Sequence, residues 1–545
     1  MICLDHRRQE AAALIGALGA GDAAVVSRSA TAVAKLPDIA SCADVAALRQ
    51  VVAPPEHAAA RAKLAELSPR LADARATYLL GLYTRARELI GPITAEARTL
   101  GYRPFQAQAE LLQGLIEIET GDMTRAKTSL DSAIWSAEAG REDEIAARAW
   151  IWLVFLIAER EADHVRGLAL VPRATAAIAR LGGNAGLESF LERTLGAVDT
   201  IRGSYDSGIQ HLQRAIELGV QAFGPDDASV ASAQLNLGSA VLGQGHPRRA
   251  LSILERGRTS TERLWGPDHP RTAQALRLLG IAHNDAGDPR LAENELRRTL
   301  AIGEATLGPQ HRDLTFTLTF LAEALDDQGR FDEAVALDRR AVAIAEKTLG
   351  PAHPVLGEAL VDLGVHLGHG RHHDEAYEQI RRGEAILAKA NGPDDPRFLL
   401  SLAQRGNLLS GQARWRDALA LYQQAIPALE RAHFTRRELT SAVIHQARGF
   451  LELHQPTRGL AALEQLATNL DELRPDLRVA VEFTLARALW DSGGDRRRAH
   501  ELASRALEDI GGLPRTHGDD IAQIERALAS HRLDASSPRP QARLR

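Results

Sequence analysis

The stretch GPQHRDL at residues 308–314 contains the letters HRDL, which open the catalytic loop of a phosphotransferase. In such a loop the aspartate, here Asp313, accepts the proton of the attacking hydroxyl, and an asparagine five residues later holds a magnesium ion. Leu318 stands at that later position, and the chain has neither a DFG triplet nor a Gly-rich loop followed by a phosphate-binding lysine. Because nothing here could hold ATP, we expect no catalytic residue and no enzyme activity.

A second candidate for chemistry is the stretch VHLGHGRHHDEA, which places His366, His369, His372 and His373 near one another. Imidazoles at such spacings can bind zinc or a similar metal. The spacing fixes no cysteine or acid beside them, and a solvated turn is the simpler interpretation. We therefore expect no metal site and no other cofactor.

The composition indicates a folded, helical chain. Of the 545 residues, 45% are hydrophobic, 25% are charged and only 4% are aromatic, and the abundance of Ala, Leu, Arg and Glu favours helices over sheets. The net charge of −6 is small for this length, and acids and bases alternate along most segments. Because no large cationic face is indicated, a nucleic acid is not the expected partner.

The sequence shows no clear membrane-spanning segment and no clear signal peptide. The longest strongly apolar run, AWIWLVFLIA at residues 149–158, is too short to cross a bilayer, and the first residues, MICLDHRRQE, do not form a signal peptide. Cys3 and Cys42 lie far apart, a pattern that fits neither a disulfide framework nor a zinc site. We expect no membrane span and a cytoplasmic protein.

The strongest pattern in the sequence is a repeat of 42 residues. A Gly-Pro pair begins at residues 224, 266, 308, 350 and 392 with no insertion between copies. In the same register an alanine column and a column of small residues run along the chain, twelve positions apart: Ala250, Ala292, Ala334, Ala376 and Ala418, and Gly238, Gly280, Ala322, Gly364 and Gly406. Weaker copies of this twelve-residue offset occur at Gly114 and Ala126 and at Gly196 and Gly208.

Each period predicts two helices that pack as a hairpin. Apolar residues between the columns recur at spacings of three and four, as on one stripe of a helix. The two small columns would let the helix backbones approach closely, while Gly245, Gly287 and Gly329 would end the first helix and the Gly-Pro pairs the second. In this register His311 belongs to a capping column with Asp227, His269, His353 and Asp395, so HRDL is interpreted as a joint between hairpins.

The paired helices with small residues at their crossing resemble the tetratricopeptide repeat, in the 42-residue form found in kinesin light chains. Phrases such as LGPAHPVLGEALVDLG carry the resemblance, which is specific over about residues 195–430. It implies an all-α, right-handed superhelical solenoid of about ten or eleven hairpins. The predicted parts are an N-terminal helical segment (1–66), degenerate hairpins (67–194), the regular array (195–432), degenerate and capping hairpins (433–530) and a disordered tail (531–545).

If this resemblance holds, the first helices of successive hairpins line a concave groove that binds a peptide or protein partner. Amide side chains there could pair with a peptide backbone, and Phe316 and Phe320 could receive an apolar anchor. The predicted partner-binding residues are Asn236, Gln274, Arg277, Asn284, Phe316, Phe320, Glu323, Asp362, Gln404 and Asn407.

A second resemblance concerns the origin of the chain. The run from Met1 to Asp44, followed by GYRPFQAQAELLQG, AGREDEIAARAW and LARALWDSGGD, is similar to the region after the catalytic domain in bacterial serine/threonine kinases that carry tetratricopeptide repeats. Two functional hypotheses follow. The first is a non-catalytic scaffold that binds a partner through its groove; the second is the sensor or substrate-docking half of such a kinase, without its catalytic domain.

Overall fold

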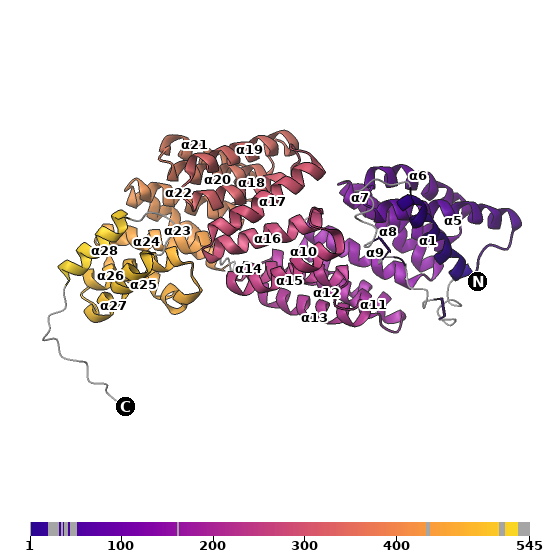
Figure 1. Cartoon of the computed structure of the whole chain (residues 1–545), viewed down its shortest axis with the longest axis horizontal. Helices are drawn as coiled ribbons and strands as arrows, with labels where there is room; N and C mark the ends of the chain where they lie inside the picture. The colour runs from indigo at the N-terminus through magenta and orange to yellow at the C-terminus, as the bar shows by residue number, and fades with distance from the viewer. Residues whose placement is uncertain are drawn as a thin grey trace, which may run out of the picture. The chain divides into compact units, whose positions relative to one another are not determined.

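The computed structural model describes residues 2–19, 32–33, 36, 42–43, 52–160, 163–431, 437–511 and 518–531 (Figure 1). Helices make up the regular structure of these residues, and no strand occurs among them. Within the same residues, no helix combines the length and the apolar character needed to span a membrane. The predicted disordered tail lies outside the described residues, except for His531. The other predicted domain boundaries stay predictions.

The chain divides into two compact units, which are described separately. Unit 1 comprises residues 1–240 and 253–272, and unit 2 comprises residues 241–252 and 273–545, so that α14, α15 and α16 contribute residues to both. The helices up to this division are α1 (Ile2–Gly19), α5 (Ala58–Leu79), α6 (Tyr83–Leu100), α7 (Arg103–Glu119), α8 (Met123–Gly140), α9 (Asp143–Phe155), the π-helix η2 (Leu156–Arg160), α10 (His164–Leu168), α11 (Val171–Arg180), α12 (Ala185–Ile201), α13 (Tyr205–Phe223), α14 (Ala228–Gly243) and α15 (Pro247–Trp265).

Unit 2 continues the pairing of helices along the chain. Its helices are α16 (Pro270–Ala286), α17 (Pro289–Leu307), α18 (Leu314–Asp326), α19 (Phe331–Leu349), α20 (Pro354–His369), α21 (His373–Asn391), α22 (Pro396–Gly411), α23 (Trp415–Arg431), α24 (Arg437–Glu452), α25 (Pro456–Glu464), the 3-10 helix η3 (Leu466–Glu472), α26 (Pro475–Asp491), α27 (Arg496–Ile510) and α28 (Gly518–Ser530). Each even-numbered helix from α18 to α22 packs against the next one, as in a row of hairpins.

Glycines with positive φ end the second helices, as the Gly-Pro pairs predict. Gly224, Gly266, Gly308, Gly350 and Gly392 have φ of 87°, 87°, 90°, 89° and 91°. Glycine adopts this region without strain, and the following proline cannot continue the helix. The turn inside each hairpin also has a positive φ, at Gly245, Gly287 and Gly329 as predicted. Arg371 and Ala413 continue this second column with φ of 66° and 58°, so the array keeps the turn even where glycine is lost.

The column of small residues lies where the two helices of a hairpin touch. A Cβ added to Gly364 would lie 2.5 Å from Cγ1 of Ile380 and 2.8 Å from the backbone oxygen of Ala376. The same holds at Gly196, whose added Cβ would lie 2.5 Å from Cγ of Leu212 and 3.0 Å from the oxygen of Gly208. The predicted twelve-residue offset therefore marks the contact between the two helices. A large apolar residue sixteen positions after the glycine fills the space above it.

Sixteen positions is also the spacing at the other glycines of the column. An added Cβ would lie 2.3 Å from Leu254 Cδ2 at Gly238, 2.7 Å from Leu296 Cγ at Gly280 and 2.6 Å from Tyr422 Cε1 at Gly406. Separations this short cannot be tolerated without moving a neighbour. Glycine is therefore required for the packing of these hairpins.

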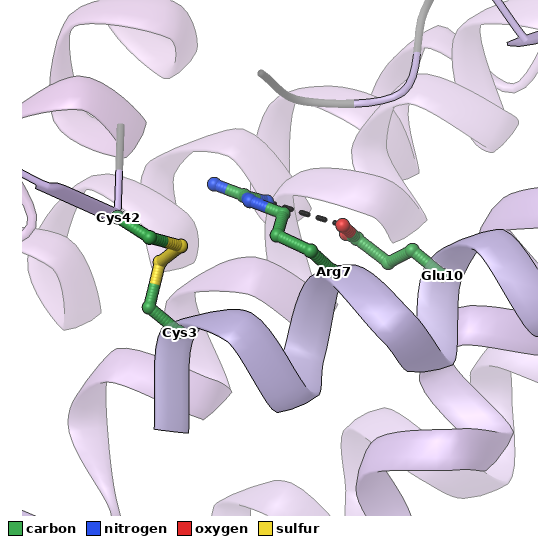
Figure 2. Close-up of a disulfide and its surroundings, with 4 residues drawn as sticks. All are labelled: Cys3, Arg7, Glu10 and Cys42. Atoms are coloured by element: carbon green, nitrogen blue, oxygen red, sulfur yellow. Dashed lines mark hydrogen bonds and ion pairs between the residues drawn. A yellow bond between two sulfur atoms is a disulfide. The ribbon is translucent and has the colours of Figure 1, made fainter. Parts of the chain in front are cut away.

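The N-terminal helix is held by contacts that the sequence did not predict. Cys3 and Cys42 form a disulfide with a Cα–Cα distance of 5.6 Å, beside the ion pair of Arg7 and Glu10 (Figure 2). The prediction that these cysteines fit no disulfide is therefore wrong. It failed because a separation of 39 residues says nothing about which loop folds back on α1. Glu10 also forms an ion pair with Arg75 of α5, in which Oε1 of Glu10 lies 2.8 Å from Nη1 of Arg75.

We predict that Gly364→Ala destabilises unit 2 by about 1–3 kcal/mol, because the new methyl group would overlap Ile380 and the backbone of Ala376. Chemical denaturation measures the change. Gly91→Ala in α6 is the matched control: an added Cβ there meets no atom within 4 Å, so better helix propensity should leave stability unchanged or raise it by up to about 1 kcal/mol. Equal effects of the two substitutions would contradict the packing role of Gly364.

We predict that reduction of the Cys3–Cys42 disulfide loosens α1, because the bond closes a 39-residue loop and should contribute up to about 4 kcal/mol locally. Hydrogen exchange of the α1 amides, with and without reductant, measures the effect. In the double variant Cys3→Ser, Cys42→Ser, exchange should be fast in both conditions. Slow exchange in the reduced wild type would show that helix packing and the Glu10–Arg75 pair suffice.

Candidate partner-binding face

The predicted partner-binding residues fall on first helices of successive hairpins. Nine of them belong to unit 2: Gln274, Arg277 and Asn284 on α16, Phe316, Phe320 and Glu323 on α18, Asp362 on α20, and Gln404 and Asn407 on α22. The tenth, Asn236 on α14, belongs to unit 1. The face of α16, α18, α20 and α22 that carries the nine residues is called the first-helix face below.

The aromatic pair contributes the apolar part of this face. The Phe316 side chain is 41% exposed, whereas Phe320, one helical turn later, is partly buried and packs against the cluster around Leu321. An exposed phenylalanine beside a half-buried one offers an anchor point for an apolar side chain of a partner.

The polar residues of the face differ in how many hydrogen bonds they already make within the chain. The Asn407 amide donates to Gln404 Oε1 at 3.0 Å and accepts from the Tyr422 hydroxyl at 2.8 Å, so part of its capacity ties α22 to α23. Asn284 is buried and donates through Nδ2 to Asp327 Oδ2 at 3.0 Å, while its own Oδ1 has no partner among the described residues.

Arg277 lies close to Asp313, the aspartate of the HRDL stretch. Burial lowers the pKa of the Arg277 guanidinium, and the charge of Asp313 opposes that change. Asp313 itself is exposed at the start of α18.

The HRDL stretch forms a helix start, as its place in the repeat predicted. His311 Nδ1 accepts a hydrogen bond from the backbone N–H of Asp313 at 3.2 Å. The other members of the capping column accept from the N–H two residues later in the same way: Asp227 from Ser229 at 2.7 Å, His269 from Arg271 at 3.1 Å, His353 from Val355 at 3.2 Å and Asp395 from Arg397 at 2.9 Å. These bonds satisfy free N–H groups of the first turn.

The histidine-rich stretch has acidic partners that spacing alone did not reveal. His366 Nδ1 lies 2.5 Å from Asp338 Oδ2, and His369 Nδ1 lies 2.8 Å from Asp326 Oδ2. Each pair joins α20 to a residue of the preceding hairpin, on α19 or α18. Among the described residues, no three His, Cys, Asp or Glu side chains are arranged to hold a metal ion. The histidines therefore serve as partners of buried carboxylates.

The repeat register contained a signal for the His366–Asp338 pair. Asp338 stands in the column that otherwise holds Leu254, Leu296, Ile380 and Tyr422, and His366 stands in the column that holds Ala240, Ala282, Ala324 and Leu408. Two charged residues that interrupt apolar columns one hairpin apart can face each other. Both side chains are buried, and Asp338 Oδ1 has no partner within the described part of the chain.

Electrostatics keep a proton on His366. Burial by itself would lower the pKa of His366, but the negative charges of Asp338, Asp326 and Asp362 raise it to about 10. Burial also raises the pKa of Asp362 well above its ordinary value; the charges of Asp338, Glu323 and Glu358 raise it further, and the charge of His366 opposes them. These surroundings therefore disfavour the ionised form of Asp362.

The geometry defines a class of protein: an all-α solenoid built from helical hairpins with small residues at each crossing. Models of the tetratricopeptide repeat match residues 188–263, 272–313 and 317–355, so the hairpins within these segments are tetratricopeptide repeats. No curated protein matches the sequence of the chain.

Three solved structures illustrate what this chain is similar to. A putative kinesin light chain with nearly identical TPR-like repeats, from Podosopora anserina, is 24% identical over 37% of this chain and 95% of its own length, with a TM-score of 0.32. A Rap protein complexed with competence and sporulation factor is 12% identical over 68% of this chain and 98% of its own, with a TM-score of 0.50. The Cut9–Hcn1 hetero-tetramer of APC/C covers 92% of this chain and 90% of its own at 14% identity, with a TM-score of 0.45.

We predict that removing one member of the His366–Asp338 pair destabilises unit 2 by about 3–5 kcal/mol, because the other is left buried without its partner. Asp338→Leu together with His366→Ala restores the residues of the apolar columns and should recover most of this loss. Denaturation of the two single variants and the double variant measures the coupling. Additive losses in the double variant would contradict a direct pairing.

The same variants give a pH test. The pKa of His366 is raised from 6.5 to about 10, so its contribution to stability is complete below pH 6.5 and is lost as the pH rises toward 10. Wild-type stability should therefore fall over this range, and the double variant should show a flatter profile. Parallel profiles would contradict a protonated His366.

Proposed function

We propose that this chain is a non-catalytic scaffold that binds a peptide or protein partner through the first-helix face of unit 2. The exposed Phe316 beside the half-buried Phe320 is the observation that carries the proposal. Aromatic side chains are enriched at protein interfaces, where they can anchor a partner. The proposed contact residues are the nine predicted ones of unit 2, with Asn236 of unit 1 as a further position.

Two facts support this proposal. Tetratricopeptide repeats match the segment that contains α16 and α18, and such arrays present their first helices to extended segments of other proteins. The Rap protein with a similar fold is complexed with competence and sporulation factor, according to its structure. Binding of another molecule is therefore compatible with this architecture.

The chain's cellular setting is part of the proposal. We propose a cytoplasmic location, as the sequence suggested, although a disulfide such as Cys3–Cys42 is more common in oxidising compartments. Trapping free thiols in intact cells would decide: alkylated Cys3 and Cys42 fit the cytoplasm, and a protected pair does not.

We predict that Phe316→Ala weakens binding of a captured partner by at least tenfold while leaving folding intact, because the side chain is already 41% exposed in the free chain. The partner is captured by crosslinking in native lysate, and its affinity for purified wild type and variant is then measured by calorimetry. Trp135→Ala is the matched control, since Trp135 is an exposed aromatic residue of α8, in unit 1.

The two variants separate the possible outcomes. Loss of affinity only in Phe316→Ala supports the first-helix face of unit 2 as the binding site. Full affinity in Phe316→Ala with loss in Trp135→Ala would move the site to unit 1 and overturn the proposal.

A further inference from the structure

The first-helix face of unit 2 already holds a cationic side chain from its own chain. Arg474, just before α26, donates through Nη1 to the backbone oxygen of Asn284 at 3.0 Å and to Asp327 Oδ2 at 2.9 Å. The two contacts join residues 190 and 147 positions apart in the sequence. Arg474 is buried, with 8% of its surface exposed. Arg474 is therefore buried against partners that are distant in sequence. These contacts define a site that fits a guanidinium group.

The rest of the guanidinium is also satisfied. Nε of Arg474 donates to Asp476 Oδ1 at 2.9 Å, and Nη2 approaches Asp476 Oδ2 at 3.4 Å. Asp327 is fixed in turn by Nδ2 of Asn284 at 3.0 Å. A planar guanidinium can use several acceptors at once, whereas the ammonium of lysine is a point charge. The site is therefore matched to arginine.

The segment that delivers Arg474 rests on the turn between α16 and α17. Cδ of Pro475 lies 2.9 Å from the position that a Cβ on Gly287 would occupy. Because Gly287 has a positive φ of 94° and no side chain, proline can approach the turn closely. This contact places Pro475, the residue after Arg474, against the turn between α16 and α17.

The site also leaves one buried acceptor unused. Oδ1 of Asn284 is buried and has no partner in the described part of the chain. Polar atoms that are buried and unpaired are costly, so a ligand that supplies donors would be favoured.

We propose that the site formed by Asn284 and Asp327 binds an arginine side chain of an extended partner peptide, and that Arg474 is its internal competitor. This inference rests on the proposed function, because it names the partner chemistry of the same face. The chain's own arginine shows which atoms bind the guanidinium: Oδ2 of Asp327 and the backbone oxygen of Asn284. A partner must displace Arg474, so affinity depends on how tightly the internal contact holds.

Removal of Arg474 provides the test. The probe is a fluorescent Gly-Arg-Gly-Arg-Gly peptide, compared with the same peptide carrying citrulline, which keeps the shape of arginine without its charge. Arg474→Ala should bind the arginine peptide at least tenfold more tightly than the wild type, and the citrulline peptide at least tenfold more weakly than the arginine peptide. Adding Asp327→Asn to Arg474→Ala should abolish the gain.

Two further variants test whether the gain in affinity is specific to Arg474. Arg487→Ala removes an equal charge from α26, at an ion pair with Glu452, and should bind the arginine peptide no better than the wild type. Arg474→Gln, which keeps much of the side chain, should show the same gain and replaces Arg474→Ala if the latter does not fold.

The outcomes are distinguishable. Equal binding of arginine and citrulline peptides would overturn the arginine site while leaving a peptide-binding face intact. An equal gain in Arg487→Ala would show nonspecific attraction and would also overturn it, as would a folded Arg474→Gln that binds neither peptide. The Phe316→Ala measurement on the captured partner tests the proposed function separately.

Discussion

The close approach of two helix backbones within each hairpin is the constraint on which the rest of this structure depends. At Gly238, Gly280, Gly364 and Gly406 an added Cβ would lie under 3.0 Å from the large residue sixteen positions later. The column recurs every 42 residues, with Ala322 in place of glycine between Gly280 and Gly364, and regular stacking of this kind gives repeat arrays an extended binding surface. The turns with positive φ at each end of a hairpin then fix where each helix begins and ends.

The regular part of this design could be predicted from the sequence because its causes are local. A Gly-Pro pair, a capping residue and two small residues act within one hairpin, and each was found where the period placed it. The HRDL letters follow the same local rule: His311 Nδ1 accepts from the N–H of Asp313, the N-cap of α18, just as His269 and His353 accept from the N–H two residues later. The register also predicted that Phe316 and Phe320 lie on a first helix, and both belong to α18.

The rest could not be predicted because it depends on contacts between distant residues. The Arg474 contact with Asn284 spans 190 residues and lies outside any period, and Cys42 reaches Cys3 through a segment that matches no repeat. The His366–Asp338 pair is intermediate. Its members interrupt two apolar columns, a signal that the register contains, but only the structure shows that they face each other at 2.5 Å. The contacts that distinguish this chain from a regular repeat array therefore involve residues that depart from the repeat.

Those departures concentrate on α18, α19 and α20 and on the segment before α26. A scaffold made only of consensus hairpins would lack these polar groups, whereas this chain buries His366 beside Asp338 and Arg474 beside Asp327. Buried charges reduce stability, but they add specificity when a partner is selected by its own charge. The Arg474–Asp327 pair therefore links the packing of the hairpins to the arginine-bearing partner proposed here.

The most direct test of this account is the hydrogen-exchange footprint of a captured partner on the whole chain. Binding at the first-helix face predicts slower exchange in α16, α18, α20 and α22, together with faster exchange in the segment around Arg474 as the internal contact is displaced. Slower exchange confined to the second helices α17, α19 and α21, or to unit 1, would contradict it.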